Sequence, residues 1–206
     1  MATPQQDVTP EFAVAFRDLM LDGIIRELPI TKKVLAAIPD AKSDYRPDPH
    51  ARTAWELAWH LANTDVQFLD GIGDFKFSMN NPESKPKIIA ELIDWYEKNF
   101  TRAADKVRSL TPEQLVTPVD FMGAFNFPAV FYLGFLNNHS IHHRGELATY
   151  LRPMGSKVPS IYGGRAATTS HSRRQAQKLL LSFLFKRDRS AEGSLSAQGK
   201  ADAIQA

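Results

Sequence analysis

Cysteine is missing from all 206 residues of the chain. The fold therefore has no disulfide, any metal site lacks thiolate ligands from the protein, and no protein thiol acts as a nucleophile. Long apolar runs are missing as well. No window reaches the roughly 18 apolar residues of a membrane-spanning helix, and residues 1–7 lack the apolar core of a secretory signal. These absences predict a cytoplasmic protein with no integral membrane association.

Outside the C-terminal part of the chain, neither positive nor negative residues are in large excess. Residues 165–206 hold eight Lys and Arg against three Asp and Glu, whereas residues 1–164 are slightly acidic and show no basic face. We therefore expect no nucleic-acid binding. The composition predicts a helical domain over residues 1–164 and a basic, partly disordered tail over residues 165–206. An apolar run at residues 179–185 of this tail is either part of a surface helix that docks on the bundle or on an anionic membrane, or part of a poorly packed terminal extension.

Helical patterns dominate the rest of the sequence, and no alternation typical of strands is present. In the first pattern apolar residues recur at steps of three and four, as one buried helical stripe requires, although Pro29 is expected to kink or split this helix. Residues 120–127 are expected to form a loop. The sequence thus predicts an all-α fold, a four-helix bundle. Its helices are expected over residues 9–38, 52–72, 84–110 and 128–152.

Three histidines lie within five residues of the last expected helix. His139 and His143 are one turn apart and share a face with the apolar residues Leu136 and Leu147, whereas His142 points toward a neighbouring face. Two imidazoles at this spacing can chelate one divalent ion. A single histidine in a helix is more often a packed or exposed residue, but two buried imidazoles need polar partners.

A tight site needs a third ligand, and His60 is the only other histidine inside an expected long helix. Three neutral histidines leave the ion its full charge and one open position, which is typical of a catalytic site. On a helical wheel, however, His60 lies with Glu56, Asn63 and Gln67. That polar strip faces either solvent or a cleft between helices, and the spacing does not decide between them.

These segments resemble a known family. The run HSIHHRGEL at residues 139–147, followed by YLRPMG at 150–155 and VPSIYG at 158–163, is similar to the C-terminal signature of the DinB-like (DinB/YfiT) proteins, and WELAWH at residues 55–60 resembles their second-helix segment. The resemblance implies a four-helix bundle that holds a divalent metal ion through three histidines. They map onto His60, His139 and His143, and His142 becomes a neighbour. The segment after residue 163 departs from the family as a divergent C-terminal extension.

The resemblance also implies an activity. Family members of known activity are often metal-dependent thiol transferases that use a low-molecular-weight thiol, such as bacillithiol or mycothiol, and some form homodimers. A thiol at the open metal position loses its proton more easily, and Glu146, by its position, is a candidate proton acceptor. We therefore expect Zn, Ni or Fe as cofactor, a small-molecule substrate, and a role in stress response or detoxification. The alternative is a non-catalytic metal-binding stress or interaction protein.

Overall fold

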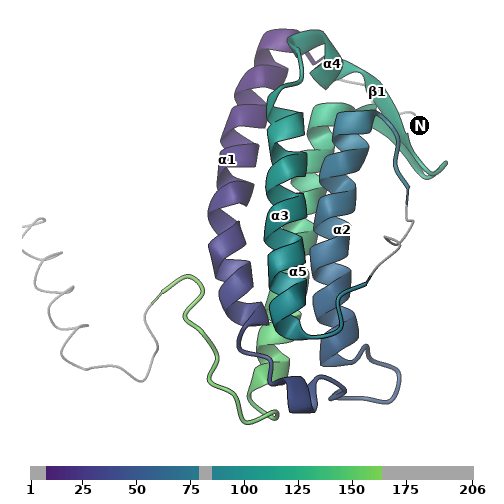
Figure 1. Cartoon of the computed structure of the whole chain (residues 1–206). Coiled ribbons are helices and arrows are strands. Elements are labelled where there is room, and N and C mark those ends of the chain that lie inside the picture. The colour runs from purple at the N-terminus through teal and green to yellow at the C-terminus, as the bar shows by residue number, and fades with distance from the viewer. Residues whose placement is uncertain (1–7, 79–84, 164–206) are drawn as a thin grey trace, which may run out of the picture. The chain divides into compact units, whose positions relative to one another are not determined.

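The computed structural model describes residues 8–78 and 85–163, which contain four long helices. Helix α2 packs against α3 and α5, and α1 packs against the same two neighbours, so the four helices close into a bundle (Figure 1). The predicted all-α bundle is therefore confirmed. The long helices are α1 (Pro10–Leu35), α2 (Ala54–Asp74), α3 (Ile89–Arg108) and α5 (Tyr132–Leu151); the short ones are η1 (Asp40–Lys42), α4 (Pro112–Val116) and η2 (Ala129–Phe131).

The chain divides into two compact units, Met1–Pro159 and Ser160–Ala206, and the bundle lies in the first. The predicted basic tail and its apolar run at residues 179–185 lie outside the described residues. Among the helices that the structure describes, none combines the length and the apolar character needed to cross a membrane.

The beginning of α2 is set by a reciprocal cap. The Thr53 hydroxyl accepts a hydrogen bond from the backbone N–H of Glu56 at 3.1 Å, and the Glu56 carboxylate accepts one from the backbone N–H of Thr53 at 2.8 Å. This capping box satisfies two N–H groups that have no partner within the helix. Helix α3 begins at Ile89, later than predicted, after Ile88 in extended backbone.

The structure differs from two expectations about the backbone. Of the kink or split expected at Pro29, the split is absent, because α1 continues through the proline as one helix with buried residues on both sides of it. Residues expected to form a loop instead form a hairpin, in which β1 (Pro118–Phe121) pairs antiparallel with β2 (Phe125–Pro128). Met122 and Gly123 turn the chain with φ of 51° and 77°. Most side chains of both strands are exposed, so the sequence shows no alternation of apolar and polar residues.

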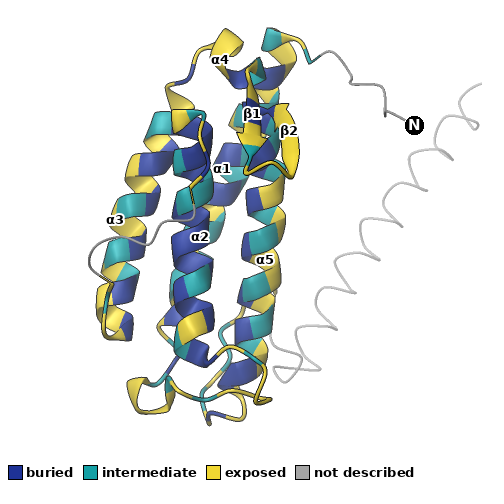
Figure 2. Ribbon diagram, turned by 90° about the vertical axis from the view of Figure 1, so that its right-hand side faces the viewer, coloured by how far each residue is buried: buried dark blue, intermediate teal, exposed yellow. Residues whose placement is uncertain are grey.

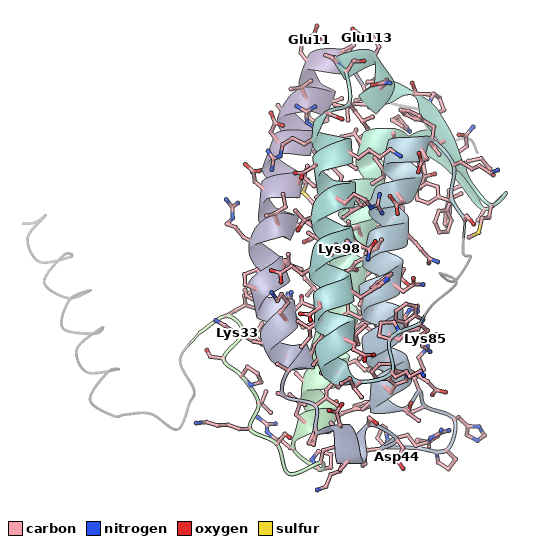
Figure 3. The ribbon with its side chains drawn as sticks, in the orientation of Figure 1. Glu11, Lys33, Asp44, Lys85, Lys98 and Glu113 are labelled. Carbon is pink, nitrogen blue, oxygen red and sulfur yellow. The ribbon has the colours of Figure 1, made fainter. Side chains whose placement is uncertain are left out.

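Helix α2 is buried on more of its circumference than the other helices (Figure 2). Four of its large apolar side chains are fully buried: Leu57, Leu61, Leu69 and Ile72. Charged side chains such as Lys33 of α1 and Lys98 of α3 point outward from the bundle (Figure 3). The buried positions of α2 also include three consecutive polar residues, Asn63, Thr64 and Asp65. Polar groups in such a place need partners, and two of them find partners on histidines.

Candidate metal centre

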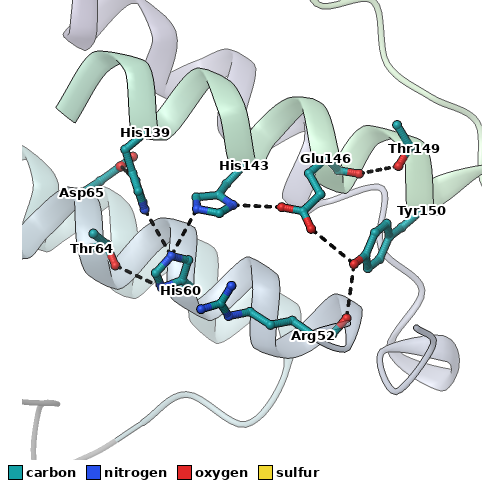
Figure 4. A network of polar contacts seen from close by, with 9 residues as sticks. All are labelled: Arg52, His60, Thr64, Asp65, His139, His143, Glu146, Thr149 and Tyr150. Carbon is teal, nitrogen blue, oxygen red and sulfur yellow. Dashed lines mark hydrogen bonds and ion pairs between the residues drawn. The ribbon is translucent and has the colours of Figure 1, made fainter. Parts of the chain in front are cut away.

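Three imidazole rings from α2 and α5 meet at one point between the helices (Figure 4). The Nε2 atom of His60 lies 3.2 Å from Nε2 of His139 and 3.2 Å from Nε2 of His143. The candidate ligand atoms of the three residues all lie within 4.8 Å of one another. The two possibilities left open for His60 are thereby resolved, because its half-buried ring faces α5 rather than solvent.

Each of the three rings is held from behind by an oxygen atom at Nδ1 (Figure 4). The Nδ1 atom of His60 lies 3.3 Å from the Thr64 hydroxyl. His139 Nδ1 lies 3.4 Å from Asp65 Oδ1, and His143 Nδ1 lies 2.9 Å from Glu146 Oε2. Such partners orient a histidine ligand and fix which ring nitrogen carries the proton.

These contacts assign the tautomers of two rings. Carboxylates only accept hydrogen bonds, so the Nδ1 atoms of His139 and His143 carry the protons and their Nε2 atoms present lone pairs. Both lone pairs face Nε2 of His60, which has at most one proton to offer. A divalent cation between the three nitrogen atoms would satisfy all of them at once.

The spacing of the nitrogen atoms fits a metal ion. A tetrahedral ion with metal–nitrogen bonds of about 2.0–2.1 Å separates its ligand atoms by roughly 3.3–3.4 Å, and the two measured separations are 3.2 Å. The donor set of three imidazoles suits Zn, Ni, Fe and Cu. This histidine cluster could therefore hold a divalent metal ion with little rearrangement.

The surroundings favour the neutral forms of His60 and His143, and an imidazole that binds a metal must be neutral. Burial, and after it the positive charge of Arg52, lower the pKa of His60 from 6.5 to about 4. Burial also lowers the pKa of His143, while its hydrogen bond with Glu146 acts in the opposite direction. The rings are not sealed off from solvent, since the side chains of His139 and His143 are 17% and 13% exposed.

A buried polar network supports the cluster on the side of Asp65. This carboxylate is 1% exposed and accepts a hydrogen bond of 2.7 Å from the Tyr96 hydroxyl while it faces His139. Burial and the neighbouring carboxylate raise the pKa of Tyr96 well above its ordinary value, so the hydroxyl stays a donor. Asp65 thus connects a histidine of α5 to a tyrosine of α3 through the core of the bundle.

Arg144 extends the buried network to α1. Its side chain is 1% exposed, forms an ion pair with Glu27, and donates a hydrogen bond of 3.0 Å to the Thr31 hydroxyl. A charged group buried to this extent is held by its partners. The segment around the two candidate ligands of α5, His139 and His143, is therefore bonded to α1 as well as to α2.

The structure brings together all four residues singled out from the sequence: His60, His139, His143 and Glu146. His142 is exposed, and its ring lies 4.7 Å from that of His143. It belongs to a second possible group with His143 and Glu146, which shares two residues with the cluster. Sequence reasoning missed Thr64 and Asp65. A usable signal was present, since Thr64 follows His60 by one helical turn.

Comparisons with known proteins agree with the architecture. The sequence profile of the DinB family matches residues 17–178. The protein YrdA of Bacillus subtilis is 26% identical over 145 residues, which cover 66% of this chain and 82% of YrdA. The crystal structure of a DinB-like protein of Bacillus subtilis, YjoA, is 23% identical with a TM-score of 0.60 and covers 71% of this chain and 99% of its own. A DinB-like protein of Bacillus cereus has 28% identity, a TM-score of 0.60, and coverage of 69% and 95%.

Proposed function

The chain belongs to the DinB family, and from this premise we propose that it binds one divalent metal ion through His60, His139 and His143 and transfers a small-molecule thiol to an electrophile. One observation carries the proposal. The lone pairs of His139 and His143 both face His60 Nε2, at 3.2 Å each, while an oxygen atom holds every ring from behind. Rings arranged in this way have their ligand atoms free for a cation.

Three protein ligands leave a four-coordinate ion one position for an exchangeable molecule. The partial exposure of His139 and His143 gives a small molecule access to that position. A divalent cation stabilises a thiolate and so lowers the pKa of a thiol that binds it. The chain has no cysteine, so the sulfur comes from the small molecule.

Glu146 is the proposed acceptor of the thiol proton. Its Oε2 atom bonds His143, its Oε1 atom lies 3.5 Å from the Tyr150 hydroxyl, and its side chain is 35% exposed. In the proposed transfer the sulfur atom forms a bond to an electrophilic carbon, and the leaving group departs with its electron pair. The thiol proton passes to Glu146 or to water. Before it accepts the proton and after it releases it, the ionised carboxylate of Glu146 is stabilised by the hydrogen bond from the His143 N–H.

A second candidate function is a metal-binding stress protein that acts as an interaction module without catalysis. Exposed aromatic side chains at the hairpin and on α5 favour it. Phe125, Phe127 and Phe135 are 47%, 38% and 42% exposed and stack on one another at about 6 Å. Exposed apolar groups that gather in this way often mark a protein interface.

Elemental analysis of the purified protein, followed by a thiol-transfer assay, tests the proposal and separates the two functions. We expect close to one metal ion per chain, lost in His139→Ala and retained in the control His142→Ala. Transfer to a model electrophile is expected to stop on chelation and return with Zn²⁺ or Ni²⁺. Metal binding without transfer for any thiol favours the interaction module, and absence of bound metal in the wild-type protein refutes both.

A further inference from the structure

Arg52 lies beside the histidine cluster at the beginning of α2. The Tyr150 hydroxyl donates a hydrogen bond of 3.3 Å to the backbone carbonyl of Arg52, which ties this part of the backbone to α5. The guanidinium of Arg52 reaches along α2 toward the ring of His60 (Figure 4). Its side chain is exposed, and its charge acts on both His60 and Tyr150. A fixed backbone thus presents a cationic group at the edge of the candidate metal centre.

Within residues 8–78 and 85–163 the guanidinium of Arg52 forms neither an ion pair nor a hydrogen bond. Other arginines of the bundle do have partners, since Arg102 pairs with Asp70 at 2.7 Å and Arg108 with Asp22 at 2.8 Å. The carboxylates nearest to the cluster already bond the imidazoles of His139 and His143.

A guanidinium next to a metal site is unfavourable by itself. Three neutral imidazoles leave a divalent ion its full charge, and a second positive charge nearby repels it. An anionic group between the two would convert this repulsion into two attractions. The guanidinium is suited to this task because its planar array of donors matches a carboxylate in a bidentate arrangement.

The opposite side of His60 is aromatic. Phe68 follows His60 by eight residues, about two helical turns, so it lies on the same face of α2. Its ring stacks on Phe121 with 5.6 Å between centroids and lies 6.1 Å from the ring of His139. The end of the cluster at Arg52 therefore carries the guanidinium and the Glu146 carboxylate, which already bonds His143, whereas the other end is apolar. The anionic part of a ligand belongs beside Arg52.

We propose that Arg52 binds a carboxylate of the thiol substrate while the sulfur atom takes the open position at the metal, so that the preferred substrate is an anionic thiol. This inference rests on the proposed function above. It adds a binding residue and a substrate class that the three histidines do not determine. An uncharged thiol would reach the metal but would gain nothing from Arg52.

The test uses the full chain loaded with Co²⁺, because a sulfur ligand gives this ion a charge-transfer absorption that reports binding without turnover. Mercaptoacetate and its neutral analogue mercaptoacetamide are titrated into the wild type, into Arg52→Gln, and into the control Arg46→Gln, which removes another exposed arginine of the preceding loop. Arg52→Gln keeps the carbonyl that Tyr150 uses. Circular dichroism and metal content confirm that each variant is folded and loaded.

We expect Arg52→Gln to weaken mercaptoacetate binding about tenfold, as for a hydrogen bond between charged groups, and to leave mercaptoacetamide binding within about twofold. Arg52→Lys should recover part of the preference, and Arg46→Gln should change neither affinity. If the ratio of the affinities for mercaptoacetate and mercaptoacetamide is the same in the wild type and in Arg52→Gln, the inference is overturned and the proposed function stands. Absence of the charge-transfer absorption with both thiols in the wild type overturns both.

Discussion

Replacing Asp65 with asparagine removes one negative charge from the core and changes almost no volume. The aspartate accepts hydrogen bonds from the Tyr96 hydroxyl at 2.7 Å and from the His139 ring at 3.4 Å. Asparagine offers one acceptor oxygen and one NH₂ donor. If its oxygen bonds Tyr96, the NH₂ group faces Nδ1 of His139, which must then give up its proton. The proton moves to Nε2 and occupies the lone pair that would bind the metal.

The cost of this change follows from the role of Asp65 behind a ligand. Loss of such a partner lowers metal affinity about 10- to 100-fold, which corresponds to roughly 1.4–2.8 kcal/mol of binding free energy. The 1% exposure of Asp65 leaves no space for water to replace the lost acceptor, so we expect the upper part of this range. Tyr96→Phe keeps the carboxylate and should lose less affinity.

Competition with a chromophoric chelator measures the affinity of each variant for Zn²⁺. Asp70→Asn is the matched control, since it lies on the same helix but pairs with Arg102 away from the cluster, and its affinity should equal that of the wild type. Denaturant unfolding of the metal-free proteins checks that all variants fold. An affinity of Asp65→Asn equal to that of a folded wild type would refute the assigned tautomer of His139.

Three further predictions concern the cluster and the core. In the metal-free protein the pKa of His60 is about 4 in the folded chain, against 6.5 in the unfolded chain. Between these pH values the unfolded chain therefore binds more protons than the folded chain. The free energy of unfolding should thus fall as the pH drops from 6.5 toward 4. Urea titrations should show this dependence, and it should weaken in His60→Gln; an identical pH dependence would contradict the shift. Glu146→Gln should lower turnover about a hundredfold at equal metal content if the carboxylate accepts the thiol proton, and unchanged turnover measured in steady-state assays would exclude that role. Leu61→Ala, at a fully buried position of α2, should cost about 2–5 kcal/mol of unfolding free energy, whereas Leu19→Ala, at a position that is 70% exposed, should change it little.

The helical spacing in the sequence was sufficient to predict which residues of one helix share a face. His139 and His143 do lie together, because positions one turn apart must do so. The same reasoning could not orient His60, since its polar strip is compatible with solvent and with an interhelical position until the packing of α2 against α5 is known. The family resemblance selected the correct alternative.

Asp65 was missed because the sequence does not show whether a polar residue of a helix is buried, whereas the spacing of Thr64 from His60 was a signal that could have been used. Asp65 becomes informative only when its 1% exposure and its contact with a ring from α5 are known. The hairpin between α4 and η2 was missed for a related reason. Val119 is the only buried residue of β1, and strands that bury so little apolar surface leave no periodic pattern to read.

The candidate metal centre is divided between helices whose ligands are 79 and 83 residues apart in the chain. A slide of α2 along α5 by a single turn, about 5.4 Å, would exceed the 3.2 Å that separates the nitrogen atoms. A cation would therefore be bound by all three histidines only at one alignment of α2 and α5, and its binding would stabilise that alignment relative to every other. The free energy of metal binding would thus add to the free energy of unfolding of the bundle.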